Sequence, residues 1–136
     1  MRKKIFGVGV DIVKIKRFEN ISEAFLSRVF TAREREYITR ACREKNFCSS
    51  QNFHHENSHF NTKINIQSAA GIFAAKEAVA KAFGTGFRGF SPQDVEILHK
   101  ENGKPYVVFH KKPRRLKIQI SISHTDSDAI AFAVIQ

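Results

Sequence analysis

The chain has 136 residues, of which 42% are hydrophobic, and this size and composition are typical of one compact folded domain. No apolar run approaches the roughly 20 residues that a transmembrane helix needs, so we expect a soluble protein without a membrane span. Lysine and arginine number 23 against 13 aspartate and glutamate residues, and the resulting charge of +10 predicts an acidic partner: nucleic acid, an anionic membrane, an acidic protein or a phosphorylated small molecule.

The cysteine content and the start of the chain bear on its compartment. Cys42 and Cys48 are too few for a disulfide framework and lack the second pair that a zinc site would need. The basic start is followed by a strand-like segment and Asp11, without a small-residue cleavage site, so we predict no secretory signal. We expect a cytoplasmic protein, or a plastid stromal one if the natural chain carries a targeting extension that is removed.

Residues 5–13 form the first predicted strand, because they alternate and are rich in valine and isoleucine. Gly7 and Gly9 in this strand allow another backbone to approach closely. We expect the strand to end near Asp11 to Val13, which would place the Asp11 carboxylate where the strand gives way to a turn or a helix.

Two short helices are predicted next. Ser22 has the position of an N-cap for a helix whose apolar residues are Phe25, Leu26, Val29 and Phe30. Thr31 and Glu34 have the spacing of a capping box for a second helix, whose apolar residues are Tyr37, Ile38 and Ala41. Both helices are expected to present arginines to solvent.

The stretch from Asn46 to about Asn65 is rich in asparagine, serine, histidine and phenylalanine and has little periodicity. This pattern indicates an inserted, flexible loop at about 46–65 within a single domain that spans residues 1–136. His54, His55 and His59 lie in the insertion, and their spacing suits metal binding only on a rigid helix, which the neighbouring residues do not favour. A solvated polar loop is the favoured interpretation.

Residues 68–83 give the strongest helix signal in the chain, because they are alanine-rich, contain no proline and are followed by Gly84. Strands are predicted after this helix at 95–98, 106–109, 117–123 and 129–135, with Asn102-Gly103 as a hairpin turn between the first two. The order of elements indicates an α+β domain in which an antiparallel sheet packs with a long central helix.

The last predicted strand has two different faces. Its apolar face carries Ile130, Phe132 and Val134, and its other face carries alanines. The small alanine side chains permit close packing against another element or against a subunit.

The long helix also carries charged residues with possible chemistry. Glu77 and Lys81 lie one turn apart on one face, and taken alone they are an ordinary surface ion pair. The helix runs into Gly84-Thr85-Gly86, and the backbone amides of such a loop can contact phosphate oxygens. The remaining parts of a Walker motif are missing, so a nucleoside triphosphatase is not supported.

Four separated segments carry a specific resemblance when they are read together. They are GVGVDIV at 7–13, FAAKEAVAKAFGTG at 73–86, NGKP at 102–105 and SISHT at 121–125. In this order they resemble the holo-[acyl-carrier-protein] synthases, the small trimeric class of 4′-phosphopantetheinyl transferases. The resemblance covers nearly the whole chain outside 46–65.

The resemblance implies an activity. A family member transfers 4′-phosphopantetheine from coenzyme A to a serine of apo-acyl carrier protein, releases adenosine 3′,5′-bisphosphate and makes the holo carrier for fatty acid biosynthesis. The family is magnesium-dependent and forms a homotrimer with active sites at subunit interfaces. An acidic carrier protein would account for the charge of +10.

The resemblance also implies residue roles. Asp11 and Glu77 match the metal-binding acids, Lys81 matches the catalytic lysine, and Glu77 is the candidate that accepts the serine proton, directly or through water. The predicted coenzyme contacts are Lys81, Gly84, Thr85, Gly86, Lys104, Pro105, His124 and Thr125. Arg17 and Arg28 are predicted to dock the carrier. Ile72 departs from the family's frequent arginine, so one phosphate contact lacks its usual cation.

A basic nucleic-acid-binding module is the main rival interpretation. It is favoured by the charge of +10 and by 13 phenylalanines, which are able to stack on bases. Most of these phenylalanines fall at core-periodic positions, and the two carboxylates have no role in such a module. Magnesium-dependent binding of coenzyme A would separate the two interpretations.

Overall fold

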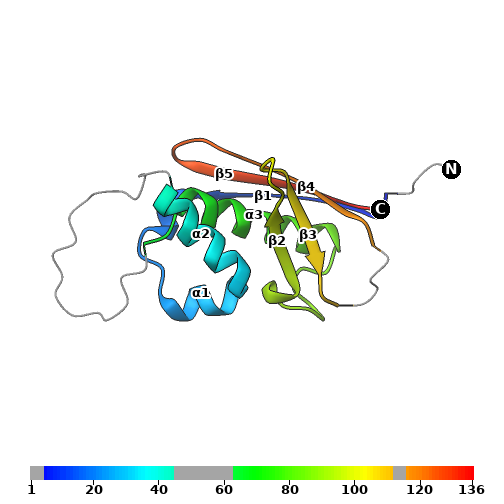
Figure 1. Ribbon diagram of the computed structural model, residues 1–136. Coiled ribbons are helices and arrows are strands. Elements are labelled where there is room, and N and C mark those ends of the chain that lie inside the picture. Colours follow the sequence, from blue (N-terminus) through cyan, green and yellow to red (C-terminus); the bar gives the residue numbers. More distant parts are fainter. Residues whose placement is uncertain (1–4, 45–62, 112–115) are drawn as a thin grey trace.

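The computed structural model describes residues 5–44, 63–111 and 116–136 (Figure 1). The elements in chain order are β1 (Gly7–Lys14), the 3-10 helix η1 (Ile15–Phe18), α1 (Glu23–Val29), α2 (Ala32–Glu44), α3 (Ile66–Ala82), the 3-10 helix η2 (Pro92–Asp94), β2 (Val95–His99), β3 (Pro105–Phe109), β4 (Ile118–His124) and β5 (Asp128–Ile135). The predicted α+β class with a long central helix is confirmed. In the described part of the chain, no helix is long and apolar enough to cross a membrane.

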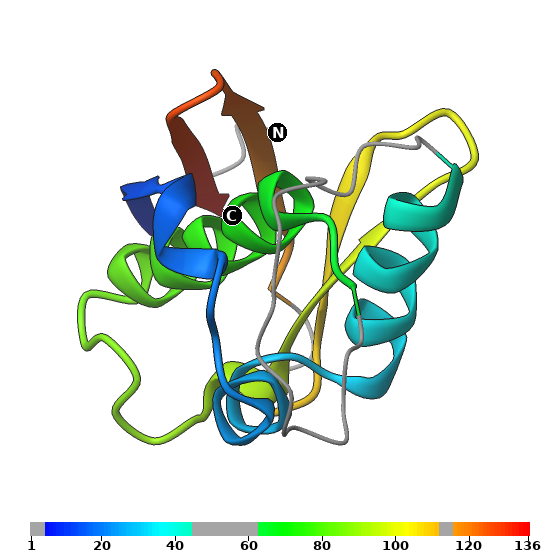
Figure 2. The ribbon, with the colours of Figure 1, turned by 90° about the vertical axis from the view of Figure 1, so that its left-hand side faces the viewer.

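The strands form two antiparallel sheets rather than the single sheet that the sequence predicted. One has the order β1-β5-β4 and the other is the hairpin β2-β3. Helix α3 lies between the three-stranded sheet and a second layer, which consists of α1, α2 and the hairpin (Figures 1 and 2). One long helix therefore connects both halves of the core.

Glycine and alanine allow α3 to lie very close to the three-stranded sheet. A Cβ atom on Gly7 would lie 1.8 Å from the carbonyl oxygen of Ala82, and one on Gly9 would lie 1.9 Å from that of Ala78. The alanines of β5 that face α3 are at most 1% exposed: Ala129, Ala131 and Ala133. The alanine face thus packs against an element of its own chain, which is the first of the two alternatives that the sequence left open, and it is not available to a neighbouring subunit.

Strand β1 begins and ends later than predicted. Its pairing with β5 continues through Lys14, which lies opposite Asp128, and the two side chains form an ion pair of 2.8 Å between Nζ and Oδ1. Asp11 pairs with Ala131 inside this ladder. Asp11 is therefore a residue of the strand and does not lie at its end.

The predicted caps of the two short helices are confirmed. The Ser22 hydroxyl accepts a hydrogen bond of 3.1 Å from the Phe25 amide at the start of α1. At the start of α2, the Thr31 amide donates to Glu34 Oε2 at 2.8 Å, and the Glu34 amide donates to Thr31 Oγ1 at 3.3 Å. These reciprocal bonds form a capping box, which satisfies amides that the helix itself leaves unpaired.

Helix α3 begins two residues before its predicted start. Asn65 is 4% exposed, and its Oδ1 accepts a hydrogen bond of 2.9 Å from the Ser68 amide, so this side chain is the N-cap. Asn65 thus belongs to the folded core and not to the predicted insertion. Most of the insertion, with His54, His55 and His59, lies outside the described residues.

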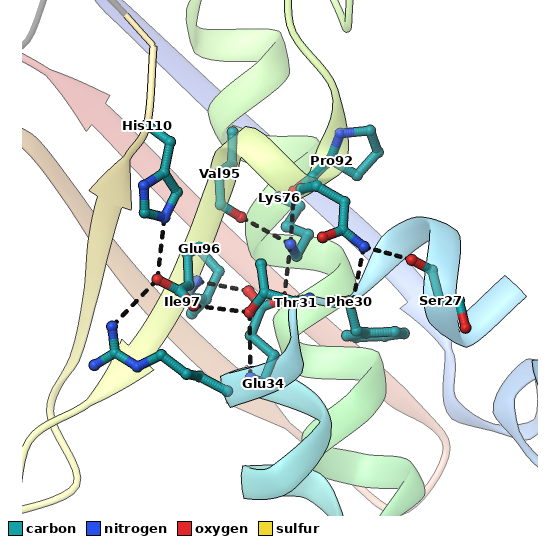
Figure 3. Close-up of polar contacts among 12 residues, drawn as sticks. Ser27, Phe30, Thr31, Glu34, Lys76, Pro92, Val95, Glu96, Ile97 and His110 are labelled. Atoms are coloured by element: carbon teal, nitrogen blue, oxygen red, sulfur yellow. Dashed lines mark hydrogen bonds and ion pairs between the residues drawn. The ribbon is translucent and has the colours of Figure 1, made fainter.

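A buried ion pair fixes α3 to the second layer (Figure 3). Lys76 is 1% exposed, and its Nζ lies 2.8 Å from Glu34 Oε2 and donates to the carbonyl oxygens of Pro92 and Val95 at 2.6 and 2.8 Å. The other Glu34 oxygen accepts a hydrogen bond of 2.6 Å from the Ile97 amide. Burial raises the pKa of Glu34 and lowers the pKa of Lys76, while the charge of each partner opposes these shifts.

We expect Lys76→Met to lower the free energy of unfolding by about 3–5 kcal/mol, because Glu34 would keep a buried charge without its partner. The double variant Lys76→Met, Glu34→Leu should recover most of this loss, since it removes both charges. Urea unfolding followed by circular dichroism measures both values. Equal losses in the single and double variants would show that the ion pair is not the cause.

Candidate active site

The site is built where β1 passes beneath the last turns of α3. Side chains alternate along β1, so Gly7, Gly9 and Asp11 point to the face that α3 covers. Asp11 is the first of the three with a side chain on that face. Lys81, in the last turn of α3, donates to Asp11 Oδ1 at 2.8 Å and to the Val10 carbonyl oxygen at 3.0 Å. The structure thus brings two of the three predicted catalytic residues into contact.

Glu77 lies one turn before Lys81 and is partly buried. Lys81 forms its ion pair with Asp11 and not with Glu77, contrary to the simple helical pair that the sequence suggested. Burial and then the negative charge of Asp11 raise the pKa of Glu77, while the charges of Lys81 and Arg17 lower it. Two carboxylates and two cations therefore share this part of the surface.

Arg17 lies nearer to the acids than the sequence indicated. Its guanidinium carbon is 5.9 Å from the ring centroid of Phe73, which is one helical turn before Glu77. No short-range pattern connects Arg17 with Glu77, because they are far apart in the chain and only the packing of η1 on α3 joins them. Arg28, the other predicted docking residue, is exposed in the last turn of α1.

The glycine-containing loop follows Lys81 directly. The Gly84 amide donates to the Lys81 carbonyl oxygen at 2.9 Å, and Gly84 and Gly86 have φ angles of 75° and 60°, which side chains rarely allow. Thr85 is exposed between them. The loop therefore begins at the backbone of the last turn of α3, which carries Lys81.

His124 and Thr125 lie at the turn between β4 and β5, at the end of the sheet where β1 also ends. His124 pairs with Ala129, which pairs on its other side with Val13. The Thr125 amide donates to the Asp128 carbonyl oxygen at 2.8 Å, which closes the turn. Both residues are exposed.

Lys104 and Pro105 lie apart from the other predicted residues. They follow Gly103, whose φ angle is 81°, at the turn of the β2-β3 hairpin, and Lys104 is exposed. Figure 2 shows this hairpin and β1 on opposite sides of α3. One chain by itself therefore does not bring this turn to Asp11.

The donor set suits a magnesium ion with two protein ligands. Among the described residues, no group of three or more His, Cys, Asp or Glu side chains gathers as a complete metal site. Asp11 and Glu77 offer hard carboxylate oxygens close enough for one charge to raise the other's pKa, and a cation would relieve that repulsion. Magnesium usually takes its remaining ligands from water and phosphate. Mg²⁺ at Asp11 and Glu77 stays a prediction.

Ile72, the departure from the family pattern, is 1% exposed and belongs to the hydrophobic core. Its side chain has no access to a solvent-exposed phosphate. Ile72 is therefore a core residue in this chain and offers no cation at this position.

Comparisons with known proteins agree with this architecture. A family model described as the 4′-phosphopantetheinyl transferase superfamily matches residues 7–134. The chain is 38% identical over 146 aligned positions to the holo-[acyl-carrier-protein] synthase of Clostridium perfringens, covering 97% of this chain and 94% of that one. It is 39% identical over 141 positions to the enzyme of the same name from Clostridium botulinum, covering 97% and 98%.

A solved structure shows the same fold. The crystal structure of a holo-(acyl-carrier-protein) synthase from Bacillus anthracis in complex with CoA (3′,5′-ADP) matches this chain with a TM-score of 0.71 and 30% identity, and 96% of each chain is covered. These findings confirm the resemblance that the four sequence segments indicated. The chain belongs to the 4′-phosphopantetheinyl transferase superfamily.

Proposed function

We propose that this chain transfers the 4′-phosphopantetheine arm of coenzyme A to a serine of an apo-acyl carrier protein. The observation that carries the proposal is the meeting of Asp11, Glu77 and Lys81 at the crossing of β1 and α3, in a chain whose relatives are named holo-[acyl-carrier-protein] synthases. The coenzyme in the Bacillus anthracis structure supports coenzyme A as the substrate. We extend the proposal to fatty acid biosynthesis in the cytoplasm and to a single transferase domain over residues 1–136.

The reaction is a phosphoryl transfer. The serine oxygen of the carrier bonds to the phosphorus that bears pantetheine, and the bond from that phosphorus to the bridging oxygen breaks. Adenosine 3′,5′-bisphosphate leaves with the electron pair of the broken bond, and the serine proton passes to a base. Glu77 is that base, preferably through a water molecule, because a carboxylate is itself a weak direct base.

The other residues hold the diphosphate and offset its charge. A magnesium ion, held by Asp11 and Glu77, would supply Lewis-acid stabilisation of the phosphate oxygens. The Lys81 ammonium offsets negative charge on the transferred group. Gly84, Thr85 and Gly86 contact the coenzyme, but not through the Gly84 amide, which already donates to the Lys81 carbonyl oxygen. His124 and Thr125 contact the coenzyme from the β4-β5 turn.

Mass spectrometry of the carrier tests the reaction most directly. The protein is incubated with coenzyme A, Mg²⁺ and an apo-acyl carrier protein, and a second sample contains a carrier whose acceptor serine is replaced by alanine. We expect the mass gain of one phosphopantetheine group in the first carrier only. No gain in either carrier would reject the proposed function.

We also propose that the chain forms a homotrimer with active sites between subunits. On the outer face of the three-stranded sheet, Val8, Val10 and Ile12 of β1 are 53%, 49% and 64% exposed. Ile130 and Phe132 of β5 are 41% and 44% exposed, and they pair across the strands with Ile12 and Val10. A contiguous exposed apolar patch of this kind is typical of a protein interface. Lys104 and Pro105 would then reach the coenzyme of a neighbouring subunit.

Arg17 is expected to recognise the acidic carrier. Arg17→Gln should raise KM for the carrier about 10-fold and weaken its dependence on salt, because the lost attraction acts on the protein partner. Arg28→Gln, the matched control on α1, should have a smaller effect: both arginines are exposed, but only the charge of Arg17 acts on Glu77. Steady-state kinetics at several salt concentrations measure both. Unchanged carrier kinetics for Arg17→Gln would reject its docking role.

A further inference from the structure

The position of the Lys81 ammonium has a consequence for metal binding. Its two hydrogen bonds are both to β1, one to Asp11 Oδ1 at 2.8 Å and one to the Val10 carbonyl oxygen at 3.0 Å. Lys81, the proposed phosphate contact, is thus hydrogen-bonded to Asp11, the proposed metal ligand. An ammonium and a divalent ion on one carboxylate repel each other, so a metal at Asp11 would weaken the hold of Asp11 on the Lys81 ammonium.

The local charges explain why Lys81 occupies this place in the protein alone. Asp11 and Glu77 bring two negative charges close together, and the charges of Lys81 and Arg17 reduce the resulting repulsion. Arg17 is placed over the Phe73 ring, whereas Lys81 contacts Asp11 directly. Lys81 is therefore the direct counter-ion of the first metal ligand.

The same side chain is free to move. The Lys81 side chain is 53% exposed while that of Asp11 is 16% exposed, so the flexible stem can leave without disturbing the core. The next residues lead to the turn at Gly84 and Gly86, where phosphate is expected. Rotation of the stem would release the ammonium from Asp11 for a phosphate bound at that loop.

We propose that Lys81 is a built-in counter-ion that occupies Asp11 in the metal-free protein and moves to the phosphates of coenzyme A when a divalent ion binds. The inference rests on the proposed function, because it assumes that Asp11 is a metal ligand. Metal and coenzyme then bind cooperatively: the metal frees Lys81 for phosphate, and phosphate holds Lys81 away from the metal site. By linkage, each ligand raises the affinity for the other by the same factor.

Binding of Mn²⁺ alone tests the exchange without any transfer reaction. Electron paramagnetic resonance of free Mn²⁺ gives the dissociation constant, and Lys81→Met should lower it about 3- to 10-fold in the absence of coenzyme, because the competing cation is gone. Lys81→Arg keeps the charge and should bind Mn²⁺ as weakly as the unaltered protein. Lys14 lies on β1, as Asp11 does, but its ammonium is paired with Asp128 of β5. Lys14→Met should therefore leave the dissociation constant for Mn²⁺ unchanged.

A second titration measures the coupling. Coenzyme A without carrier should increase the Mn²⁺ affinity of the unaltered protein, after correction for Mn²⁺ bound by free coenzyme, and the factor should be smaller in Lys81→Met. Asp11→Asn distinguishes failure of the proposed metal site from failure of the proposed Lys81 exchange. If it leaves Mn²⁺ affinity with coenzyme unchanged, the proposed metal site is wrong. If it abolishes that affinity while Lys81→Met binds Mn²⁺ no more tightly than the unaltered protein, the site stands and the exchange is overturned.

Discussion

Glu77→Gln should reduce kcat by about 10²- to 10⁴-fold, the range for loss of a positioned proton acceptor, while the folded structure stays intact. Glutamine keeps the shape of the side chain but removes the negative charge on which both metal binding and proton acceptance depend. Glu77 is only partly buried, and the described residues supply no hydrogen bond to its carboxylate, so the fold does not require it. Turnover of the carrier with coenzyme A at saturating Mg²⁺ measures the loss.

A matched control separates this effect from general damage. Glu36→Gln makes the same chemical change at an exposed position of α2 and should leave turnover unchanged. Thermal unfolding of both variants should coincide with that of the unaltered protein. Near-normal turnover of Glu77→Gln, with the same unfolding curve, would remove Glu77 from the reaction.

Features that depend on neighbouring residues could be predicted from the sequence. The cap at Ser22 and the capping box of Thr31 and Glu34 require only residues three positions apart, and both are present. The Asn102-Gly103 turn has the positive φ angle at Gly103 that such a hairpin needs. Local chemistry of this kind is visible in the chain because its partners are close in sequence.

Features that depend on distant partners could not be predicted. In the sequence, Lys76 is an ordinary charged residue of an alanine-rich helix. Its burial is visible only in the structure, where its ammonium contacts Glu34 and the carbonyl oxygens of Pro92 and Val95. The alternation of β5 identified two faces but not which one α3 would cover. The glycines of β1 decide this, because only a face without Cβ atoms lets α3 approach so closely.

Some site residues could be predicted from the sequence motifs, and others are brought together only by the fold. Motif resemblance indicated Asp11, Glu77 and Lys81 together, and the crossing of β1 and α3 brings Lys81 onto Asp11. The motif gave no indication that Arg17 lies beside Glu77, since that depends on how η1 packs on Phe73. A residue that was assigned to the carrier thus also contributes to the charge balance of the acids.

Phe132→Glu should dissociate the proposed trimer and remove most of its activity at low protein concentration. Phe132 pairs with Val10 on the exposed apolar face of the sheet, and a carboxylate there would lose its water on burial against a neighbour. The alanine face of β5 is not altered, so the chain itself should stay folded. Light scattering and a carrier assay measure the two effects on one sample.

The dependence of activity on protein concentration shows whether Phe132→Glu loses activity because the trimer dissociates. Association follows mass action, so activity per chain of Phe132→Glu should rise as the protein is concentrated, together with the scattering mass. Ala32→Glu adds the same charge at an exposed position of α2, away from the sheet, and should stay trimeric and active. A Phe132→Glu monomer with full activity would reject shared sites, because one chain would then bring every required residue to the coenzyme. Activity that stays low while the trimer re-forms would instead place the damage within the chain.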